Sequence, residues 1–215
     1  MFEVMPDVHS DVRGCFSEVV KAQGFWPKGE IPLWFASTDW IRQVNRSVSS
    51  PGTVRGCHAQ KAPCCQGKLV EAVTEKVYDI ITDARPESPT FGTTSAFLLD
   101  STTQNKLWVP HGFLHSFVVP FTVGNTVFQY FCDGTYSKEY EVGVSPLTLL
   151  PKAVEELKAL KNEELDKKFV DLYDVFDKKL SLSDKDLAAP NYEEWMGKVL
   201  DEYLTTKKIW YKDWK

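Results

Sequence analysis

The sequence changes character near Pro151, and this change constrains the fold more than any other feature. Residues 1–150 are rich in Val, Phe, Thr, Trp and Tyr, and Gly and Pro break them into short stretches. This composition is typical of short strands joined by turns, and many such strands at close spacing predict a sandwich or a barrel. We expect a hairpin over 68–83 and further strands over 94–99, 107–109, 113–119 and 126–131.

Residues 151–215 form a second region, dense in Lys, Glu, Asp and Leu. Apolar residues recur at helical spacing within 152–177 and 192–203, which predicts amphipathic helices. Ser183 is a candidate cap for a short turn ahead of Asp186. The region has too few apolar residues for a core of its own. We therefore expect a charged helical extension that packs on the barrel of residues 1–150 or on a partner subunit.

Charge, hydropathy and cysteine usage exclude several classes of protein. The formal net charge of −5 argues against a general nucleic-acid binder, because such proteins need a basic surface. No apolar run approaches the roughly 20 residues that span a bilayer, and residues 1–13 show no signal-peptide pattern. We expect a cytoplasmic protein with no membrane partner. The odd count of five cysteines favours reduced thiols, and their spacing fits no standard zinc pattern.

One stretch of the first region combines side chains that can handle protons. Within residues 52–60, His58 and Gln60 share one strand face, which can point into a barrel. Taken alone, a hydrogen-bonded core histidine is the simpler interpretation of His58. Further reactive side chains lie on or beside the expected strands: Lys68, His115, Tyr130 and, after a turn, Tyr136.

Seven short motifs follow one another between residues 7 and 143. They read D-x-R-G-x-F-x-E, Q-x-N-x-S-x-S, G-x-x-R-G-x-H-x-Q, Q-G-K-L-V, D-x-R-x-x-S-P-T-F-G, W-V-P-x-G-F-x-H and F-x-Y…Y. This order resembles that of the dTDP-4-dehydrorhamnose 3,5-epimerase family. Each motif alone is weakly specific, whereas seven in the same order are strongly so.

The resemblance implies a mainly β, cupin-like double-stranded β-helix (jelly-roll) barrel that forms a homodimer and uses no metal or redox cofactor. It implies a nucleotide-linked 4-keto-6-deoxy sugar as the substrate, with dTDP as the nucleotide. By the same resemblance His58 is the general base, Tyr130 the general acid, and Lys68 lies near the developing enolate. Other positions match residues that contact the substrate, hold the nucleotide, complete the neighbouring subunit's site or lie against the base: Arg13, Phe16, Glu18, Gln43, Asn45, Arg55, His115 and Tyr136, with Gln60 as a further candidate.

These residue types suit the implied chemistry. A ketone at C4 acidifies the protons at C3 and C5, and their removal leaves an enolate that a cation such as Lys68 can stabilise. Histidine, with an ordinary pKa of about 6.5, accepts a proton near neutral pH. A tyrosine on the opposite face, with an ordinary pKa of about 10, can return one. Arginines such as Arg55 suit a diphosphate because the guanidinium fork matches phosphate oxygens.

The match to the family fails at one point. The family orients its catalytic histidine with an aspartate that follows the last tyrosine, but here residues 143–148 contain none. Ser145 and Thr148 can hydrogen-bond an imidazole without supplying a charge. Asp171, Asp174 and Asp177 of the charged insert that follows are candidates for the carboxylate, and the sequence leaves the choice open. The later family signature L-S-x-K-D is present at residues 182–186, and His111 is expected to be a surface loop residue.

Three alternatives stay open beside the full 3,5-epimerase. The first is an epimerase that acts at one position only or on another nucleotide's sugar. The second is a non-catalytic relative that binds nucleotide sugars, which the missing aspartate favours and the joint presence of His58, Lys68 and Tyr130 disfavours. The third is a metal-dependent cupin that uses His58, His111 and His115.

Overall fold

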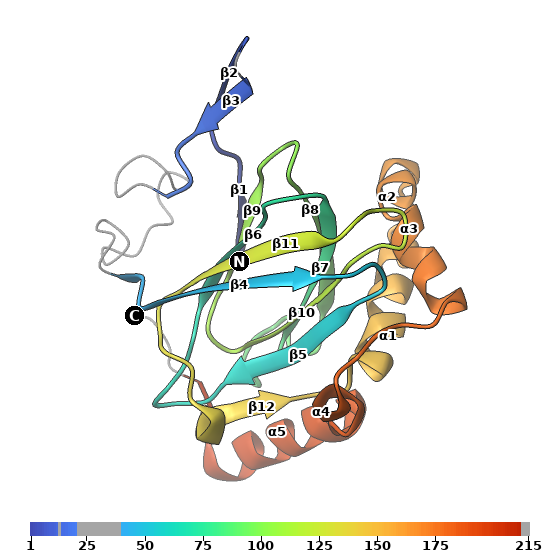
Figure 1. The fold of residues 1–215 in the computed structure, drawn as a ribbon. Helices are drawn as coiled ribbons and strands as arrows, with labels where there is room; N and C mark the ends of the chain where they lie inside the picture. Colours follow the sequence, from blue (N-terminus) through green and yellow to red (C-terminus); the bar gives the residue numbers. More distant parts are fainter. Residues whose placement is uncertain (13, 21–39, 212–215) are drawn as a thin grey trace.

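The computed structural model describes residues 1–12, 14–20 and 40–211, and its centre is a barrel made of two facing β sheets (Figure 1). The strands in chain order are β1 (Phe2–Val4), β2 (Val8–Asp11), β3 (Gly14–Ser17), β4 (Gln43–Ser49), β5 (Val54–Gln60), β6 (Lys68–Ala72), β7 (Lys76–Asp83), β8 (Thr94–Asp100), β9 (Lys106–Val109), β10 (Phe113–Val118), β11 (Thr126–Cys132) and β12 (Glu141–Gly143). The four single strands expected between residues 94 and 131 are confirmed, each within one residue at its ends.

The chain crosses between the two sheets at nearly every step. The first sheet has the order β1-β9-β6-β11-β4 and the second has the order β12-β5-β10-β7-β8. Neighbouring strands in both sheets pair antiparallel. Such alternation between two antiparallel sheets is the topology of a jelly roll. The expected mainly β, cupin-like barrel is therefore confirmed.

The hairpin expected over residues 68–83 is wrong. Strand β6 pairs with β9 and β11, whereas β7 pairs with β8 and β10. The short turn between them carries the chain from one sheet to the other, and Glu75 in this turn has a positive φ of 57°. Two apolar stretches around a short polar turn resemble a hairpin in sequence, but here the strand edges pair with segments further along the chain.

The second sheet is covered on both faces. Val77 and Ile81 of β7 face the barrel core, where they pack with Phe128. Tyr78 and Ile80 of the same strand face outward and pack beneath the helices. Because both faces are buried, β7 is buried along almost its whole length and lacks the polar–apolar alternation of a half-exposed strand.

The helices of the second region cover the outer face of this sheet and its lower edge (Figure 1). They are α1 (Pro146–Ala159), α2 (Glu163–Lys168), α3 (Val170–Tyr173), α4 (Asp184–Leu187) and α5 (Tyr192–Thr206), with 3-10 turns at Lys138–Tyr140 and Asp174–Asp177. Helix α1 begins before residue 151, and Pro151 lies inside it. Its buried face, which includes Leu150 and Leu157, shares one apolar cluster with the outer face of the sheet. Across the described residues, no helix is long and apolar enough to cross a membrane.

The N-terminal strands β2 and β3 form a separate two-stranded sheet. Figure 1 shows this hairpin projecting beyond the end of the barrel. Phe16, on β3, has an exposed fraction of 67%. An aromatic side chain held in this exposed position is available to another molecule.

Candidate active site

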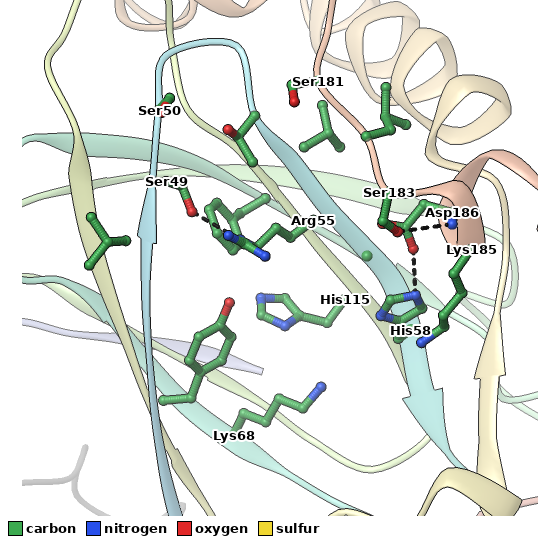
Figure 2. Close-up of a pocket in the computed structure, with 17 residues that line it drawn as sticks. Ser49, Ser50, Arg55, His58, Lys68, His115, Ser181, Ser183, Lys185 and Asp186 are labelled. Atoms are coloured by element: carbon green, nitrogen blue, oxygen red, sulfur yellow. Dashed lines mark hydrogen bonds and ion pairs between the residues drawn. The ribbon is translucent and has the colours of Figure 1, made fainter.

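A cavity of about 510 Å³ opens at the mouth of the barrel. Five of the residues predicted from the sequence line it: Arg55, His58, Lys68, His115 and Tyr130. They come from four strands, β5, β6, β10 and β11, and one further wall is the segment 181–186 of the C-terminal extension. Figure 2 shows the labelled polar side chains of both regions facing one space.

Asp186 supplies the carboxylate for His58. Its Oδ1 lies 2.8 Å from His58 Nε2, and its Oδ2 accepts a 2.8 Å hydrogen bond from the Ser183 hydroxyl. The Ser183 side chain also accepts a hydrogen bond from the Asp186 amide, which confirms Ser183 as the cap of helix α4. Because an ionised carboxylate only accepts hydrogen bonds, His58 Nε2 carries the proton and the lone pair of the neutral ring is on Nδ1.

Two of the sequence-based candidates, Asp171 and Asp174, are therefore wrong. Asp171 pairs with Lys76 at 2.8 Å and accepts a hydrogen bond from Thr122, and Asp174 is exposed. The side chain of Asp177 lies outside the described residues. Of the two hydroxyl candidates, Thr148 makes its contacts elsewhere: its hydroxyl donates to the Ser145 carbonyl and accepts from the Tyr192 amide.

The surroundings of His58 keep its imidazole neutral. Burial lowers the pKa of His58 below its ordinary value of 6.5, and the Lys185 ammonium lowers it further. The carboxylates of Asp186 and Glu141 oppose this shift, and Lys68 adds to it. An imidazole with a lowered pKa is unprotonated near neutral pH, so it is ready to accept a proton.

Lys68 and Tyr130 complete the reactive part of the pocket. Lys68 begins β6, and burial lowers the pKa of its amine below the ordinary value of 10.5. Tyr130 lies on the neighbouring strand β11, and burial raises the pKa of its phenol, which therefore keeps its proton. The pocket thus holds a proton acceptor, a buried amine and a proton donor.

His115 and Arg55 stand at fixed positions in the same cavity. His115 Nε2 lies 2.8 Å from Asp79 Oδ2, and both side chains are buried. The His115 ring meets the Tyr130 ring edge to face, with 6.1 Å between centroids. Arg55 donates a 2.9 Å hydrogen bond to Ser49 at the rim. Asp79 and Ser49 thus hold His115 and Arg55 in place; Asp79 was not identified from the sequence, and Ser49 occurred there only as part of the Q-x-N-x-S-x-S motif.

The other predicted residues lie outside the lining of the cavity. Gln43 donates a 2.7 Å hydrogen bond to Asn45 and accepts one from the Tyr136 amide, and Gln60 accepts one from the Ser137 amide. These contacts hold the loop that follows β11. Phe16 and Glu18 belong to or follow the projecting hairpin, and Arg13 lies outside the described residues.

His111 is not the surface residue expected from the sequence. It is buried, and its Nε2 lies 3.0 Å from Asp133 Oδ2. His58, His111 and His115 each contact a different aspartate. Within the described part of the chain, no three His, Cys, Asp or Glu side chains gather in an arrangement that could hold a metal ion.

A jelly-roll barrel whose pocket holds an oriented neutral imidazole, a buried amine and a protonated phenol defines an acid–base enzyme. This chain belongs to the dTDP-4-dehydrorhamnose 3,5-epimerase family, whose sequence profile matches residues 1–194. It is an isomerase of the epimerase type, and the expected family and reaction class are confirmed.

Individual relatives agree with this assignment. The chain is 34% identical to the dTDP-4-dehydrorhamnose 3,5-epimerase of Mycobacterium tuberculosis over 197 residues, which cover 90% of this chain and 83% of that protein. A solved dTDP-6-deoxy-D-glucose-3,5-epimerase from Legionella pneumophila, in complex with dTDP-4-keto-L-rhamnose, matches with a TM-score of 0.67 and 27% identity over 92% of this chain and 90% of that one. A 4-keto-6-deoxy sugar epimerase from the novobiocin gene cluster of Streptomyces spheroides matches with a TM-score of 0.69 and 27% identity over 92% and 85%.

Proposed function

We propose that the protein inverts C3 and C5 of a dTDP-linked 4-keto-6-deoxyhexose by proton transfer between His58 and Tyr130. The observation that carries this proposal is the His58–Asp186 contact in a pocket that Lys68 and Tyr130 also line. A non-catalytic binder has no need of an oriented base together with an acid. The similarity to the Legionella enzyme, which was solved with dTDP-4-keto-L-rhamnose, supports the substrate class.

The proposed reaction begins with His58 Nδ1, which takes the proton from C5 or C3. The electron pair of the broken C–H bond moves through the carbonyl onto the C4 oxygen and forms an enolate. Lys68 and His115 stabilise this oxygen, because charge that develops on it in the transition state is best met by prearranged donors. Tyr130 then donates its phenolic proton to the opposite face of the same carbon, the carbonyl re-forms, and the centre is inverted.

Arg55 is proposed to bind the diphosphate at the rim of the cavity. Its guanidinium is held by Ser49, which reduces the entropy lost when it binds phosphate oxygens. Gln43, Asn45 and Gln60 support this region indirectly, through the loop that they hold around residues 136–137.

Solvent deuterium exchange tests the proposal. The purified protein is mixed with dTDP-4-keto-6-deoxyglucose in heavy water and followed by NMR. We expect label at both C3 and C5, and we expect His58→Ala and Tyr130→Phe to abolish inversion. Tyr203→Phe, on helix α5, is the matched control and leaves the label unchanged.

The outcomes separate the rival functions. Label at one carbon only would restrict the protein to single-position epimerisation. No label, in a protein that still binds dTDP, would overturn the catalytic proposal and favour a non-catalytic binder.

We also propose that the protein acts as a homodimer in which the β2–β3 hairpin reaches the partner's pocket. The hairpin projects from its own barrel (Figure 1). The side chain of Phe16 on this hairpin is exposed. Light scattering on the purified protein tests the dimer, and a monomeric mass would contradict it.

We further propose a cytoplasmic location, where thiols such as the free Cys15 and Cys64 stay reduced. Cell fractionation tests this location.

A further inference from the structure

Glu141 lies beside the proposed base and has no role so far. It lies on β12, which pairs with β5 so that Gly143 is opposite His58 and Glu141 is opposite Gln60. Residues two apart on a strand share a face, so the Glu141 side chain lies on the face that carries His58. Its Oε1 is 3.6 Å from His58 Nδ1, the nitrogen that bears the lone pair.

The other carboxylate oxygen of Glu141, Oε2, contacts two exposed side chains. Oε2 lies 2.6 Å from Lys185 Nζ and accepts a 2.9 Å hydrogen bond from the Tyr136 hydroxyl. The Glu141 side chain is 13% exposed and that of Lys185 is 55% exposed. Glu141 therefore links the buried nitrogen of His58 to side chains in contact with water.

If one base inverts two centres, His58 and Tyr130 must both return to their starting protonation states between the two inversions. After the first inversion, His58 holds the proton it removed and Tyr130 has lost its own. The second inversion, at the other carbon, cannot begin until His58 is neutral and Tyr130 is protonated again. A route for protons between this pocket and water is needed between the two steps.

We propose that Glu141 is the proton acceptor that resets His58 between the two inversions. The inference rests on the proposed function and adds one step to it. The Nδ1–H bond of the imidazolium breaks, an O–H bond forms on Glu141 Oε1, and the proton then passes to water. Tyr130 regains its proton from water, so the protons balance over the cycle.

The groups around His58 leave Glu141 as the acceptor. Asp186 is buried, and its carboxylate contacts His58 at Nε2 and accepts a hydrogen bond from the Ser183 hydroxyl, so it orients the ring rather than taking the proton from Nδ1. Lys185 of α4 and Lys68 of β6 lower the pKa of His58, so they favour loss of the proton from the ring. Glu141 is the carboxylate next to Nδ1, and the imidazolium attracts it across the 3.6 Å gap once the ring is charged.

Rapid-quench kinetics test the step. Enzyme and substrate are mixed in heavy water, and the singly and doubly inverted sugars are resolved over time. In Glu141→Gln, which keeps the shape and the Lys185 hydrogen bond, we expect the first inversion at the wild-type rate. We expect the second inversion and steady-state turnover to slow by on the order of 10²-fold, with the singly inverted sugar accumulating.

Two further variants make the result specific. Glu139→Gln, which changes an exposed carboxylate two residues away, is the matched control and shows wild-type kinetics. Glu141→Ala leaves space for a small acid, so added formate should restore steady-state turnover without changing the first inversion.

Equal slowing of both inversions in Glu141→Gln, or no response of Glu141→Ala to formate, would overturn the relay and leave the proposed function intact. A wild-type protein that inverts neither centre would instead overturn the proposed function, and the reset step with it. A singly inverted product from the wild-type protein would also contradict the reset step, because one inversion requires no second use of the base.

Discussion

The contact between Asp186 and His58 determines which imidazole nitrogen is available to act as the proposed base. A carboxylate at Nε2 fixes the tautomer that has its lone pair on Nδ1, and it stabilises the imidazolium that forms when Nδ1 takes a proton. The position of the ring and its readiness to react thus depend on a residue 128 positions later in the chain.

Replacing this carboxylate with an amide should remove both effects. In Asp186→Asn we expect kcat to fall by on the order of 10²–10⁴, the usual range for the loss of general acid–base assistance. Binding of dTDP, measured by calorimetry, should stay unchanged because we propose that Arg55, and not this residue, binds the diphosphate. Asp184→Asn, in the same helix turn, is the control and keeps its kcat; an active Asp186→Asn protein would show that His58 needs no orienting carboxylate.

The pH dependence of the reaction follows from the lowered pKa of His58. The base must be neutral, so kcat/KM falls as the pH drops through this pKa. Burial and Lys185 lower the pKa of His58, and the charges of Asp186 and Glu141 only partly oppose this shift. The fall in kcat/KM at low pH should therefore be centred below pH 6.5. A pH–rate profile of deuterium incorporation measures it, and a limb at or above pH 6.5 would show that His58 is not buried as described.

The candidate proton-transfer residues could be recognised from the sequence, but the contacts that tune them could not. His58, Lys68 and Tyr130 occur in motifs that can be recognised locally, and all three line one cavity. Asp186 was within a recognised signature at 182–186, but the sequence gives no sign that this segment folds back over β5. His111 was misjudged for a similar reason, because its burial depends on Asp133, 22 residues away.

The four-residue helix α4 carries Asp186, which contacts His58, and Lys185, which lowers the pKa of His58. Asp186 binds the ring at Nε2, and Lys185 binds Glu141 on β12. The approach to the helix is fixed by Ser181, which forms a bridge with Thr53 at the start of β5. A short helix has little stability of its own, so its cap and these contacts determine its position.

Removal of the α4 cap should therefore affect both stability and activity. Ser183→Ala loses a hydrogen bond to the helix and one to the Asp186 carboxylate, and we expect a loss of about 1 kcal/mol in the free energy of unfolding together with a lower kcat. Asn191→Ala removes the cap of α5, which lies away from the cavity. It should cost a similar free energy in urea unfolding and leave kcat unchanged; equal loss of kcat in both variants would show a general effect of stability.

Strand positions were predicted more reliably than strand partners. The stretches that became β8 to β11 stand out by composition and by the turn residues between them, which are local signals. Pairing is decided by contacts between distant segments, and the short polar turn after β6 gave no indication that β7 would join the other sheet. The helices of the extension were also predicted from a local signal, the spacing of their apolar residues. The surface on which they pack depends on distant segments and could not be predicted.

The projecting hairpin leads to a prediction for the proposed dimer, in which the hairpin of one subunit completes the pocket of the other. Phe16→Ala impairs the hairpin of one subunit, and His58→Ala disables the barrel of another. In a mixed dimer the intact barrel receives the intact hairpin of its partner, so mixing the two variants should restore about a quarter of wild-type activity after random exchange of subunits. No recovery, despite exchange shown by mass spectrometry, would indicate that each hairpin serves its own barrel.

The place of Asp186 and Lys185 late in the chain has a consequence for synthesis on the ribosome. The strands that supply His58, Lys68, His115 and Tyr130 all emerge before residue 133, and N-terminal segments generally begin to fold while the rest is still being made. The proposed base can therefore be oriented only after Asp186 has been made, well after the last of these strands. We expect a protein truncated before residue 183 to lose epimerase activity, because its His58 lacks the Asp186 contact.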